Sequence, residues 1–271
     1  MIDFDAAAGF IHRTARLLER HRFSQRFKGA GPEPVVRTLR AYRNADGGFG
    51  HALEPDLRDP ASQPAATQAA LEVLHEAGAR EAELIDGACG FFTAIARADG
   101  GIPFCLPSAA AHPRGPWWQP ADATSLTQTA ANAAALHALG HEHPWLERAD
   151  AYVWRRVEAR DFLDSSYDVL FTIWFLGAVP DAARAEAALD ALRPQLAGQL
   201  TLDHAPLPGS RARRLFEPAK VERELDALEA GQLDDGGWTF DFPAWAPGPE
   251  QEWRGIMTLR ALVLLRDNGR L

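Results

Sequence analysis

Four segments of the chain are composed almost entirely of apolar and small residues, and they align with one another without gaps. They are QPAATQAALEVL (63–74), QTAANAAALHAL (128–139), DVLFTIWFLGAV (168–179) and RGIMTLRALVLL (254–265). An amphipathic surface helix carries charged residues along one face. The near absence of charge in the middle of these segments therefore predicts four buried helices.

Six further segments mix charged and apolar residues at helical spacing, which predicts amphipathic helices. They cover residues 10–21, 34–42, 82–97, 145–158, 181–196 and 218–228. No segment shows the alternating pattern of a strand. Buried helices alternating with amphipathic ones predict an all-α fold, an α/α toroid of about ten to twelve helices with parallel inner helices lining a central cavity. We expect one domain over residues 1–271, and a linear solenoid is the alternative arrangement.

A sharp turn recurs before three of the buried segments. It reads NADGGFG at 44–50, RADGGIPF at 97–104 and LDDGGWTF at 233–240. Glycine adopts positive φ at low cost, so Asp-Gly-Gly favours a tight turn. The large side chains that follow need an apolar environment. Each turn is therefore expected to dock onto a core.

The third copy of the turn, GQLDDGGW, resembles the QxxxGxW repeat of terpenoid cyclases such as squalene-hopene cyclase, through Gln232, Gly236 and Trp238. A similar turn occurs in protein prenyltransferase β subunits, which share the α/α toroid. The pattern spans roughly residues 35–267, although the first copy has Arg43 in place of the glutamine and the second has Ile102 in place of the tryptophan. The resemblance implies a toroid in which the glutamine and tryptophan tie the turn to neighbouring helices.

The same resemblance implies acid catalysis on an apolar, possibly isoprenoid, substrate. Cyclases that protonate an alkene place a DxDDT motif at the start of an inner helix. The corresponding segments are SLTQT (125–129), which has no acid, and SSYDV (165–169), which keeps only Asp168. The complete motif is absent, and Asp168 is the candidate proton donor, with burial favouring its protonated form. The zinc ligands of prenyltransferases are also absent.

Aligning the buried helices places polar residues in three tiers, because side chains at i and i+4 share a helix face. The first aligned position holds Gln63, Gln128, Asp168 and Arg254; one turn later come Thr67, Asn132, Thr172 and Thr258, and one turn earlier Asp59, Thr124, Asp164 and Glu250. These tiers predict a polar lining near the helix amino ends. Helix capping, hydroxyl bonds to the preceding turn, or an Asp168–Arg254 ion pair are alternative explanations.

The loops that precede the buried helices carry further candidates. GHALEPDLRDP (50–60) supplies Glu54 and Asp56, which are expected to contact substrate; its three carboxylates could hold Mg²⁺, or pair with Arg58. Tryptophan rings can stack on a ligand or stabilise a cation, or pack in the core. The predicted substrate-binding residues are Glu54, Asp56, Gln63, Trp117, Gln128, Trp174, Trp253 and Arg254. One pocket at the amino ends of the inner helices is expected, with short connections near Gly78 and Gly140 closing the other end.

Composition limits the partners. The net charge of −9 argues against nucleic acid, whose phosphates require a basic surface. No apolar run reaches the length of a membrane span, and the acidic start MIDFDAAAGF does not resemble a signal peptide. Cys89 and Cys105 form no C-x-x-C pair, so no metal site is expected from thiolates. We expect a cytoplasmic protein with a small apolar or isoprenoid ligand, and a second subunit is a possible cover for the pocket. A non-catalytic isoprenoid- or lipid-binding toroid and a carbohydrate-active α/α barrel are the alternative functions.

Overall fold

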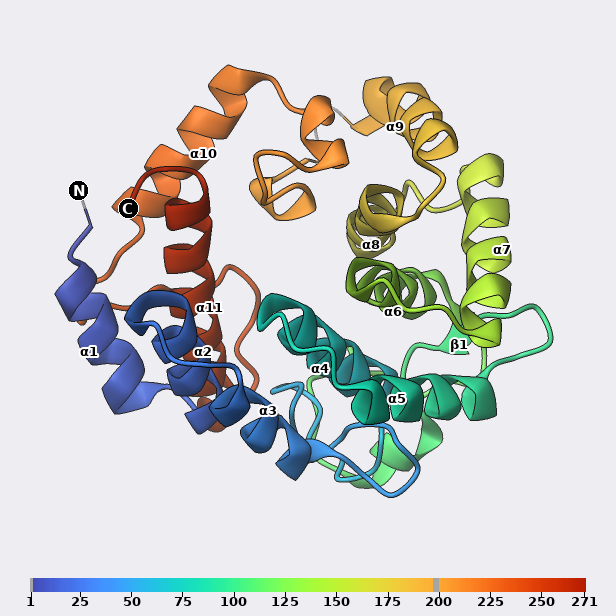
Figure 1. The fold of residues 1–271 in the computed structure, drawn as a ribbon, viewed down its shortest axis with the longest axis horizontal. Helices are drawn as coiled ribbons and strands as arrows, with labels where there is room; N and C mark the ends of the chain where they lie inside the picture. Colours follow the sequence, from blue (N-terminus) through green and yellow to red (C-terminus); the bar gives the residue numbers. More distant parts are fainter. Residues whose placement is uncertain (1, 197–199) are drawn as a thin grey trace. The chain divides into compact units, whose positions relative to one another are not determined.

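The chain is helical over most of the residues that the computed structural model describes, which are 2–196 and 200–271 (Figure 1). The elements in chain order are α1 (Phe4–Thr14), α2 (Leu17–Lys28), α3 (Glu33–Leu39), η1 (Arg40–Tyr42), α4 (Pro64–Glu76), α5 (Ala82–Ile95), β1 (Ile102–Pro103), η2 (Pro107–Ala111), β2 (Thr124–Ser125), α6 (Leu126–Leu139), α7 (Pro144–Ala159), α8 (Ser166–Ala178), α9 (Ala182–Leu196), η3 (Leu202–His204), η4 (Arg211–Leu215), α10 (Pro218–Ala230) and α11 (Pro247–Asp267). β1 and β2 form a short antiparallel pair that sequence patterning missed, because two residues are too few to alternate. The predicted all-α fold is confirmed.

The described residues fall into two compact units. Unit 1 comprises Met1–Ala41, Pro206–Gly209 and Phe216–Leu271, and unit 2 comprises Tyr42–Ala205 and Ser210–Leu215, in each case without the residues excluded above. Each unit is described by itself.

In unit 2, α6 is the central helix and packs against α4, α7 and α8 (Figure 1). Twelve of its residues are buried, Asn132 among them. Small alanine side chains allow neighbouring helices to approach α6 closely on several sides. The prediction that residues 128–139 form a buried helix is confirmed, as are the related predictions for α4 and α8.

Local sequence sets the ends of these helices. The side chains of Ser125 and Ser165 accept backbone N–H groups in the first turns of α6 and α8. Pro64 stands in the first turn of α4, where its missing N–H removes no helical bond. Gly140 ends α6 in the left-handed conformation. Serine caps thus set the starts of α6 and α8, a proline fits the start of α4, and a glycine ends α6.

In unit 1, α11 packs against α1, α2 and α10, and α2 packs against α3. The predicted helix over residues 10–21 is wrong, because α1 ends at Thr14 and α2 starts at Leu17. Ala15 has an extended backbone, and its side chain faces Gly255 of α11, where a Cβ atom would approach Ala15 to within 2.8 Å. The break is therefore imposed by packing on α11. α11 itself begins at Pro247, seven residues before the predicted buried segment 254–265.

The three Asp-Gly-Gly turns have the same internal hydrogen bonds. In each, the aspartate side chain accepts the N–H of the second glycine at 3.0–3.1 Å, as Asp46 does from Gly48 and Asp235 from Gly237. The first glycine has a φ of about 90°, and a Cβ atom at Gly236 would collide with the backbone oxygen of Ala6. Glycine is therefore required both by the turn and by its close approach to a helix.

Each turn forms a hydrogen bond with a threonine of a buried helix. The N–H of the residue after the second glycine donates to Thr67 Oγ1, Thr129 Oγ1 or Thr258 Oγ1 at 2.9–3.1 Å. Each of these hydroxyls donates to the carbonyl four residues earlier, at 2.6–2.9 Å. One threonine thus satisfies a buried backbone donor and fixes the turn to its helix.

This contact corrects the sequence alignment of the second helix. Thr129, rather than Asn132, is the counterpart of Thr67 and Thr258, so the second segment is displaced by three residues. The remaining buried helix, α8, has Thr172 at the position that aligns with Thr67 and Thr258. The Oγ1 of Thr172 is buried without a hydrogen-bond partner in the described structure. No Asp-Gly-Gly turn precedes α8.

Unit 1 also contains a fully buried carboxylate, Glu19. Arg16 makes two bonds to it, at 2.8 and 2.9 Å, and Arg22 lies at 3.5 Å. Burial acts to raise the pKa of Glu19, but Arg16 and Arg22 together outweigh burial and hold that pKa below its ordinary value. Glu19 is therefore ionised in the folded protein.

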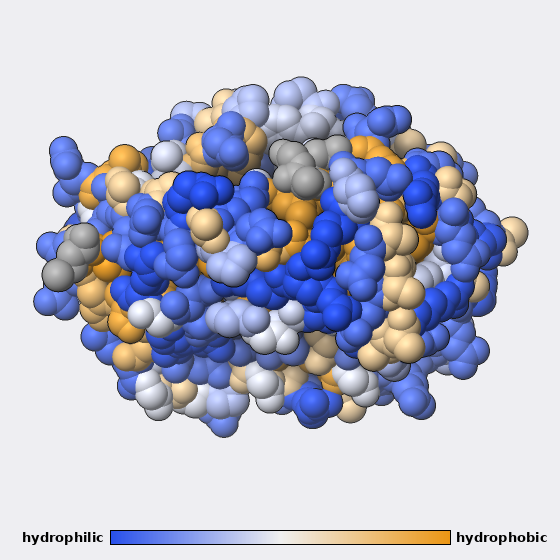
Figure 2. All heavy atoms as spheres, turned by 90° about the horizontal axis from the view of Figure 1, so that it is seen from above, coloured by the Kyte–Doolittle hydropathy of each residue, from blue (hydrophilic) through white to orange (hydrophobic). Residues whose placement is uncertain are grey.

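The remaining surface is conventional for a charged chain. The face drawn in Figure 2 is covered mostly by hydrophilic residues, with hydrophobic residues scattered among them. Among the described residues, no helix is both apolar enough and long enough to cross a bilayer.

Replacing the buried threonines by valine tests the docking contact. We expect Thr129→Val and Thr258→Val each to lower the free energy of unfolding by about 1–3 kcal/mol, because each leaves a buried backbone N–H without an acceptor. Thr172→Val is the matched control and should not lower that free energy, since it removes a buried hydroxyl that has no partner in the described residues. Urea unfolding measures all three, and equal losses would contradict this role for Thr129 and Thr258.

Replacing Glu19 by glutamine tests the buried ion pair. Because the folded pKa of Glu19 is depressed, its contribution is fully present above the unfolded value of about 4.3 and is lost as pH falls through the folded pKa. Glu19→Gln should cost about 3 kcal/mol at pH 7, since it leaves Arg16 uncompensated, and should flatten the acid limb of the stability curve. Urea unfolding from pH 7 to pH 3 provides the measurement. The control is Glu222→Gln, which alters an exposed pair with Arg270 and should cost under about 0.5 kcal/mol.

Candidate functional site

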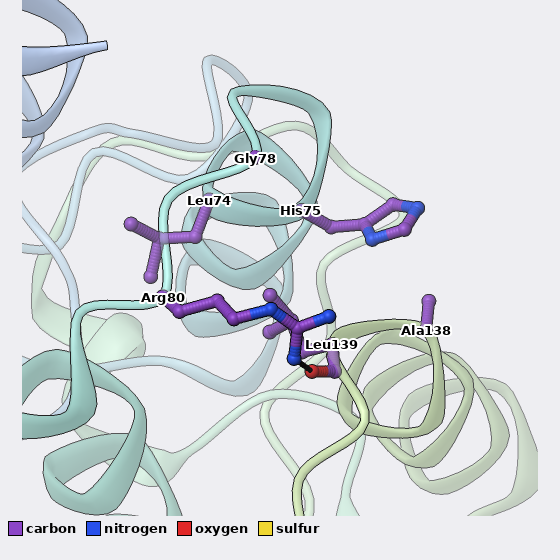
Figure 3. A pocket seen from close by; sticks show the side chains of 6 residues that line it. All are labelled: Leu74, His75, Gly78, Arg80, Ala138 and Leu139. Carbon is purple, nitrogen blue, oxygen red and sulfur yellow. Dashed lines mark hydrogen bonds between the residues drawn. The ribbon is translucent and has the colours of Figure 1, made fainter.

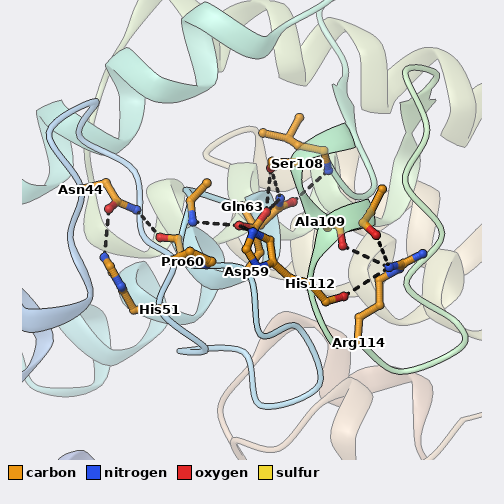
Figure 4. Close-up of polar contacts among 12 residues, drawn as sticks. Asn44, His51, Asp59, Pro60, Gln63, Ser108, Ala109, His112 and Arg114 are labelled. Carbon is orange, nitrogen blue, oxygen red and sulfur yellow. Dashed lines mark hydrogen bonds and ion pairs between the residues drawn. The ribbon is translucent and has the colours of Figure 1, made fainter.

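The amino end of α4 in unit 2 is organised around the buried carboxylate of Asp59 (Figure 4). Its Oδ2 accepts the amide of Gln63 at 2.7 Å and the hydroxyl of Ser108 at 2.6 Å. Its Oδ1 accepts the N–H of Ala61 at 2.9 Å, and Nε2 of His112 lies 3.5 Å from that oxygen. Asp59 thus joins the start of α4 to η2.

Gln63 completes the same connection. Its amide nitrogen donates to Asp59 and to Ser108, and its carbonyl oxygen accepts the N–H of Leu106 at 2.8 Å. Both amide hydrogens are therefore used within the protein. The contacts of Gln63 are structural, and its predicted contact with a ligand stays a prediction.

The loop before Asp59 has an unusual backbone. His51 and Ala52 have φ values of 53° and 60°, a conformation that is uncommon outside glycine. Asn44 holds this loop through two contacts, with His51 Nε2 at 2.9 Å and with the carbonyl of Pro60 at 3.0 Å (Figure 4). The first Asp-Gly-Gly turn, which contains Asn44, thereby fixes the acidic loop.

Residues 113–122, which include Trp117, form a second loop that packs against the acidic loop of residues 50–60. The N–H of Arg58 donates to the carbonyl of Pro113, and the N–H of Gly115 donates to the carbonyl of Asp56 at 2.8 Å. Arg114 donates to four carbonyl oxygens along the second loop, including that of Trp118 at 2.9 Å. Asp56 is buried, and Glu54 accepts its N–H at 3.2 Å.

An aromatic cluster lies beneath this pair of loops. Trp118 stacks on Phe104 with a centroid separation of 4.7 Å and packs with Leu57 and Ala65. Trp117 is half-buried against the same cluster. The candidate stacking residue Trp117 is thus positioned beside the acidic loop, and Trp118 is the buried member of the pair.

The cysteines are not suited to nucleophilic chemistry. Burial raises the pKa of Cys89 to about 12 and that of Cys105 to about 11. Both thiols are free and buried. Because the thiolate is the reactive form, neither cysteine is a candidate nucleophile near neutral pH.

Asp168 lies at the start of α8, half-buried, next to α6. Thr127 of α6 donates to its Oδ1 at 2.5 Å, and the N–H of Asp168 donates to Ser165 Oγ at 3.2 Å. The burial predicted for Asp168 is therefore partial, and its side chain joins two buried helices.

Three buried polar atoms of α6 and α8 have no hydrogen-bond partner in the described structure. They are Gln128 Oε1, Asn132 Oδ1 and Thr172 Oγ1, and none of these side chains is more than 2% exposed. An unpaired buried polar group costs about 1–3 kcal/mol. A hydrogen bond from a ligand to any of these three atoms would remove that free-energy cost.

The remaining predicted residues have defined neighbours. In unit 2, Trp174 donates from its ring nitrogen to the carbonyl of Asp203 at 2.8 Å. In unit 1, Arg254 forms two 2.8 Å bonds with Asp235 and lies over the ring of Phe10. The hydrogen bond from Arg254 holds the pKa of Asp235 below its ordinary value. Asp168 and Arg254 thus have different partners, Thr127 and Asp235.

Trp253 and the repeat motif also belong to unit 1. Trp253 meets the ring of Phe242 edge-on at 5.2 Å. Gln232 donates to the carbonyls of Asp3 and Gly236, and Trp238 is buried and donates to the carbonyl of Leu228 at 2.7 Å. Gln232 and Trp238 tie the turn to neighbouring helices, as the resemblance implied.

Two pockets of unit 2 adjoin the carboxyl ends of buried helices. The first has a volume of about 210 Å³ and is lined by Leu74, His75, Gly78, Arg80, Ala138 and Leu139 (Figure 3). Arg80 crosses it and donates to the carbonyl of Leu139 at 2.6 Å. The end of the helices beside Gly78, where closure was expected, therefore carries a pocket. The second pocket includes His137, and neither pocket is lined by the predicted site residues.

Within the described residues, no group of three or more histidine, cysteine, aspartate or glutamate side chains is arranged to hold a metal ion. The carboxylates considered for Mg²⁺ include Asp59, whose oxygens already accept three hydrogen bonds from the protein. The acidic loop is thus positioned by its own contacts.

No protein-family model matches the chain, and a search of curated proteins finds no match.

Sequence reasoning missed three histidine–carboxylate contacts, those of His112 with Asp59, of His137 with Asp150 and of His141 with Asp86. His112 was not connected with Asp59 because they are far apart in sequence and meet only when η2 covers α4. His137 bonds Asp150 at 2.8 Å. A signal for the second pair was present, since His137 is a titratable residue near the end of an otherwise apolar helix.

Replacing Asp59 by asparagine tests the role of its carboxylate. The new amide would place N–H donors opposite the amide of Gln63 and the hydroxyl of Ser108, so we expect a loss of about 2–4 kcal/mol in unfolding free energy. Hydrogen exchange should increase in residues 104–111. Asp122→Asn, which alters an exposed partner of Arg97, serves as the control and should cost under about 0.5 kcal/mol. Wild-type stability of Asp59→Asn would show that Asp59 does not hold the loops together.

Proposed function

We propose that this chain is a single-domain relative of the α/α toroid proteins and acts as a terpenoid cyclase-like protein on an apolar, isoprenoid substrate. The observation that carries the proposal is a structural motif that occurs three times. In each copy, the N–H that follows an Asp-Gly-Gly turn donates to a threonine of a buried helix. The contacts of Gln232 and Trp238 further support the resemblance to the cyclase repeat.

In this proposal Asp168 is the acid. Its carboxyl group transfers a proton to one carbon of a substrate double bond, and the positive charge forms on the neighbouring carbon. The electron pair of a second double bond closes a ring, and loss of a proton ends the reaction. Asp168 is supported as donor by its half-buried place at the start of α8 and by the hydroxyl of Thr127, which orients its carboxyl group.

The proposed substrate is apolar and has one polar end. Trp174 presents a ring on the same helix as Asp168, and such a ring favours a carbocation through its π face. Gln128 Oε1, buried and unpaired, is an acceptor for a hydroxyl at the polar end. The substrate's remaining length would lie along apolar side chains of α6 and α8.

A non-catalytic function is the second candidate, and a specific observation favours it. The cyclase motif has several acids, whereas Asp168 is the one acid of the segment 165–169. Its carboxylate accepts a hydrogen bond from the hydroxyl of Thr127. A carrier or sensor of an isoprenoid would need the same apolar site without a strong acid. Turnover therefore separates the two candidates.

Ligand character and turnover test the proposal together. Native mass spectrometry of the protein purified from cells should reveal a bound isoprenoid or other lipid, and incubation with squalene or farnesol should give cyclised products by gas chromatography. Asp168→Asn should lower that activity at least about 100-fold, while the control Asp164→Asn, at an exposed position, should retain it. Full activity in Asp168→Asn would remove the proposed acid. Lipid binding without turnover would favour the carrier, and a bound sugar would overturn both candidates.

A further inference from the structure

A groove of about 650 Å³ lies along α7 in unit 2, away from Asp168 and Asp59. Its residues on α7 run from Glu147 to Glu158 at helical spacing, so they share one face of that helix. His137 at the end of α6 and residues 179–184 at the start of α9 complete the lining. We call this the α7 groove.

Trp154 shows that this groove accommodates an organic cation. The guanidinium group of Arg184 lies over the Trp154 ring, 3.9 Å from its centroid. The same guanidinium group donates to Glu158 at 2.5 Å. An aromatic face and a carboxylate are the two features by which proteins bind guanidinium and ammonium groups. The head of Arg184 therefore occupies a cation site built from α7.

Arg184 is a weakly held occupant. Its side chain is 45% exposed, and that of Glu158 is 64% exposed. Exposed ion pairs contribute little because water competes for both partners and a long side chain must be ordered. The Trp154 side chain, in contrast, is buried and fixed edge-on against Phe175. A ligand cation can therefore replace the exposed guanidinium head of Arg184 while the Trp154 ring keeps its position.

Asp150 supplies a second, rigid anionic contact. His137, whose side chain is only 7% exposed, bonds one oxygen of its carboxylate at 2.8 Å. In the described structure no other side chain binds Asp150, and its side chain remains 25% exposed in the groove. The second carboxylate oxygen is thus available to a ligand, while the histidine fixes the orientation of the group.

The charge of the groove favours a cation over an anion. Four carboxylates line it, those of Glu147, Asp150, Glu158 and Asp181, against the guanidinium groups of Arg155 and Arg184. The guanidinium group of Arg155 already donates a hydrogen bond outside the groove lining, to the carbonyl of Asp99 at 2.8 Å. Val179 and Pro180 provide an apolar wall.

We propose that the α7 groove is a second binding site, which takes a small organic cation with a guanidinium or primary ammonium head and a short apolar chain. The head displaces Arg184 from Trp154 and Glu158 and is within the field of Asp150, and the chain lies on Val179 and Pro180. The site goes beyond the proposed cyclase-like function and is independent of it.

Isothermal titration of the full chain tests this proposal with three probes: butylguanidinium, its neutral isostere butylurea, and anionic butyrate. Butylguanidinium should bind, and the other two should not. Arg184→Gln should tighten butylguanidinium binding about three- to tenfold, because the competing internal cation is gone. Asp150→Asn and Glu158→Gln should each weaken it.

The matched control is Arg193→Gln, on the same helix but outside the groove, which should leave the dissociation constant unchanged. Equal binding of butylurea, stronger binding of butyrate, or the same affinity in Arg184→Gln and wild type would each overturn the proposal. So would an absence of binding in both proteins. A far-ultraviolet circular dichroism spectrum unchanged from wild type shows that each variant keeps its helical fold.

Discussion

The structure depends on one hydrogen-bonding constraint. When a tight turn is buried against a helix, the backbone N–H that follows the turn needs an acceptor. The N–H that follows each Asp-Gly-Gly turn points at a helix whose own carbonyls are already used. A threonine hydroxyl solves this problem, because it can accept that N–H and donate to the carbonyl four residues earlier. The same solution occurs in both units, so the turn and the helix must be treated as a single structural element.

The helix that no Asp-Gly-Gly turn contacts, α8, keeps polar groups that the other three helices use for packing. In α4, α6 and α11 the threonine belongs to the scaffold. In α8 the hydroxyl of Thr172 is buried and has no partner in the described residues, and Asp168 lies one turn before it. The omission of this contact in the fourth helix therefore leaves the buried hydroxyl of Thr172 without the backbone donor that its three counterparts accept.

Much of the fold was predictable because burial and helical spacing are local properties of the sequence. The buried helices α4, α6 and α8 and the amphipathic α5, α7, α9 and α10 lie within a few residues of their expected limits. The break at Ala15 was not predictable, since it arises from contact with Gly255, distant in sequence. The three-residue displacement of the second helix was missed for a related reason: alanine-rich segments align equally well in several registers, and only the turn contact to Thr129 selects one.

The candidate sites were less predictable than the fold, because the chemistry of an acid depends on which of its oxygens the protein has already used. Asp59 and Asp150 are both aspartates near helices, and the sequence drew attention only to the first. In the structure the carboxylate of Asp59 accepts three hydrogen bonds and holds two loops together, whereas among the described residues only the side chain of His137 binds Asp150, which lines a groove. Of these two aspartates, Asp59 is thus the one whose carboxylate oxygens are occupied by hydrogen bonds within the protein. A carboxylate becomes available for binding where one neighbour orients it and solvent still reaches it, and this condition is set by packing between helices rather than by any local motif.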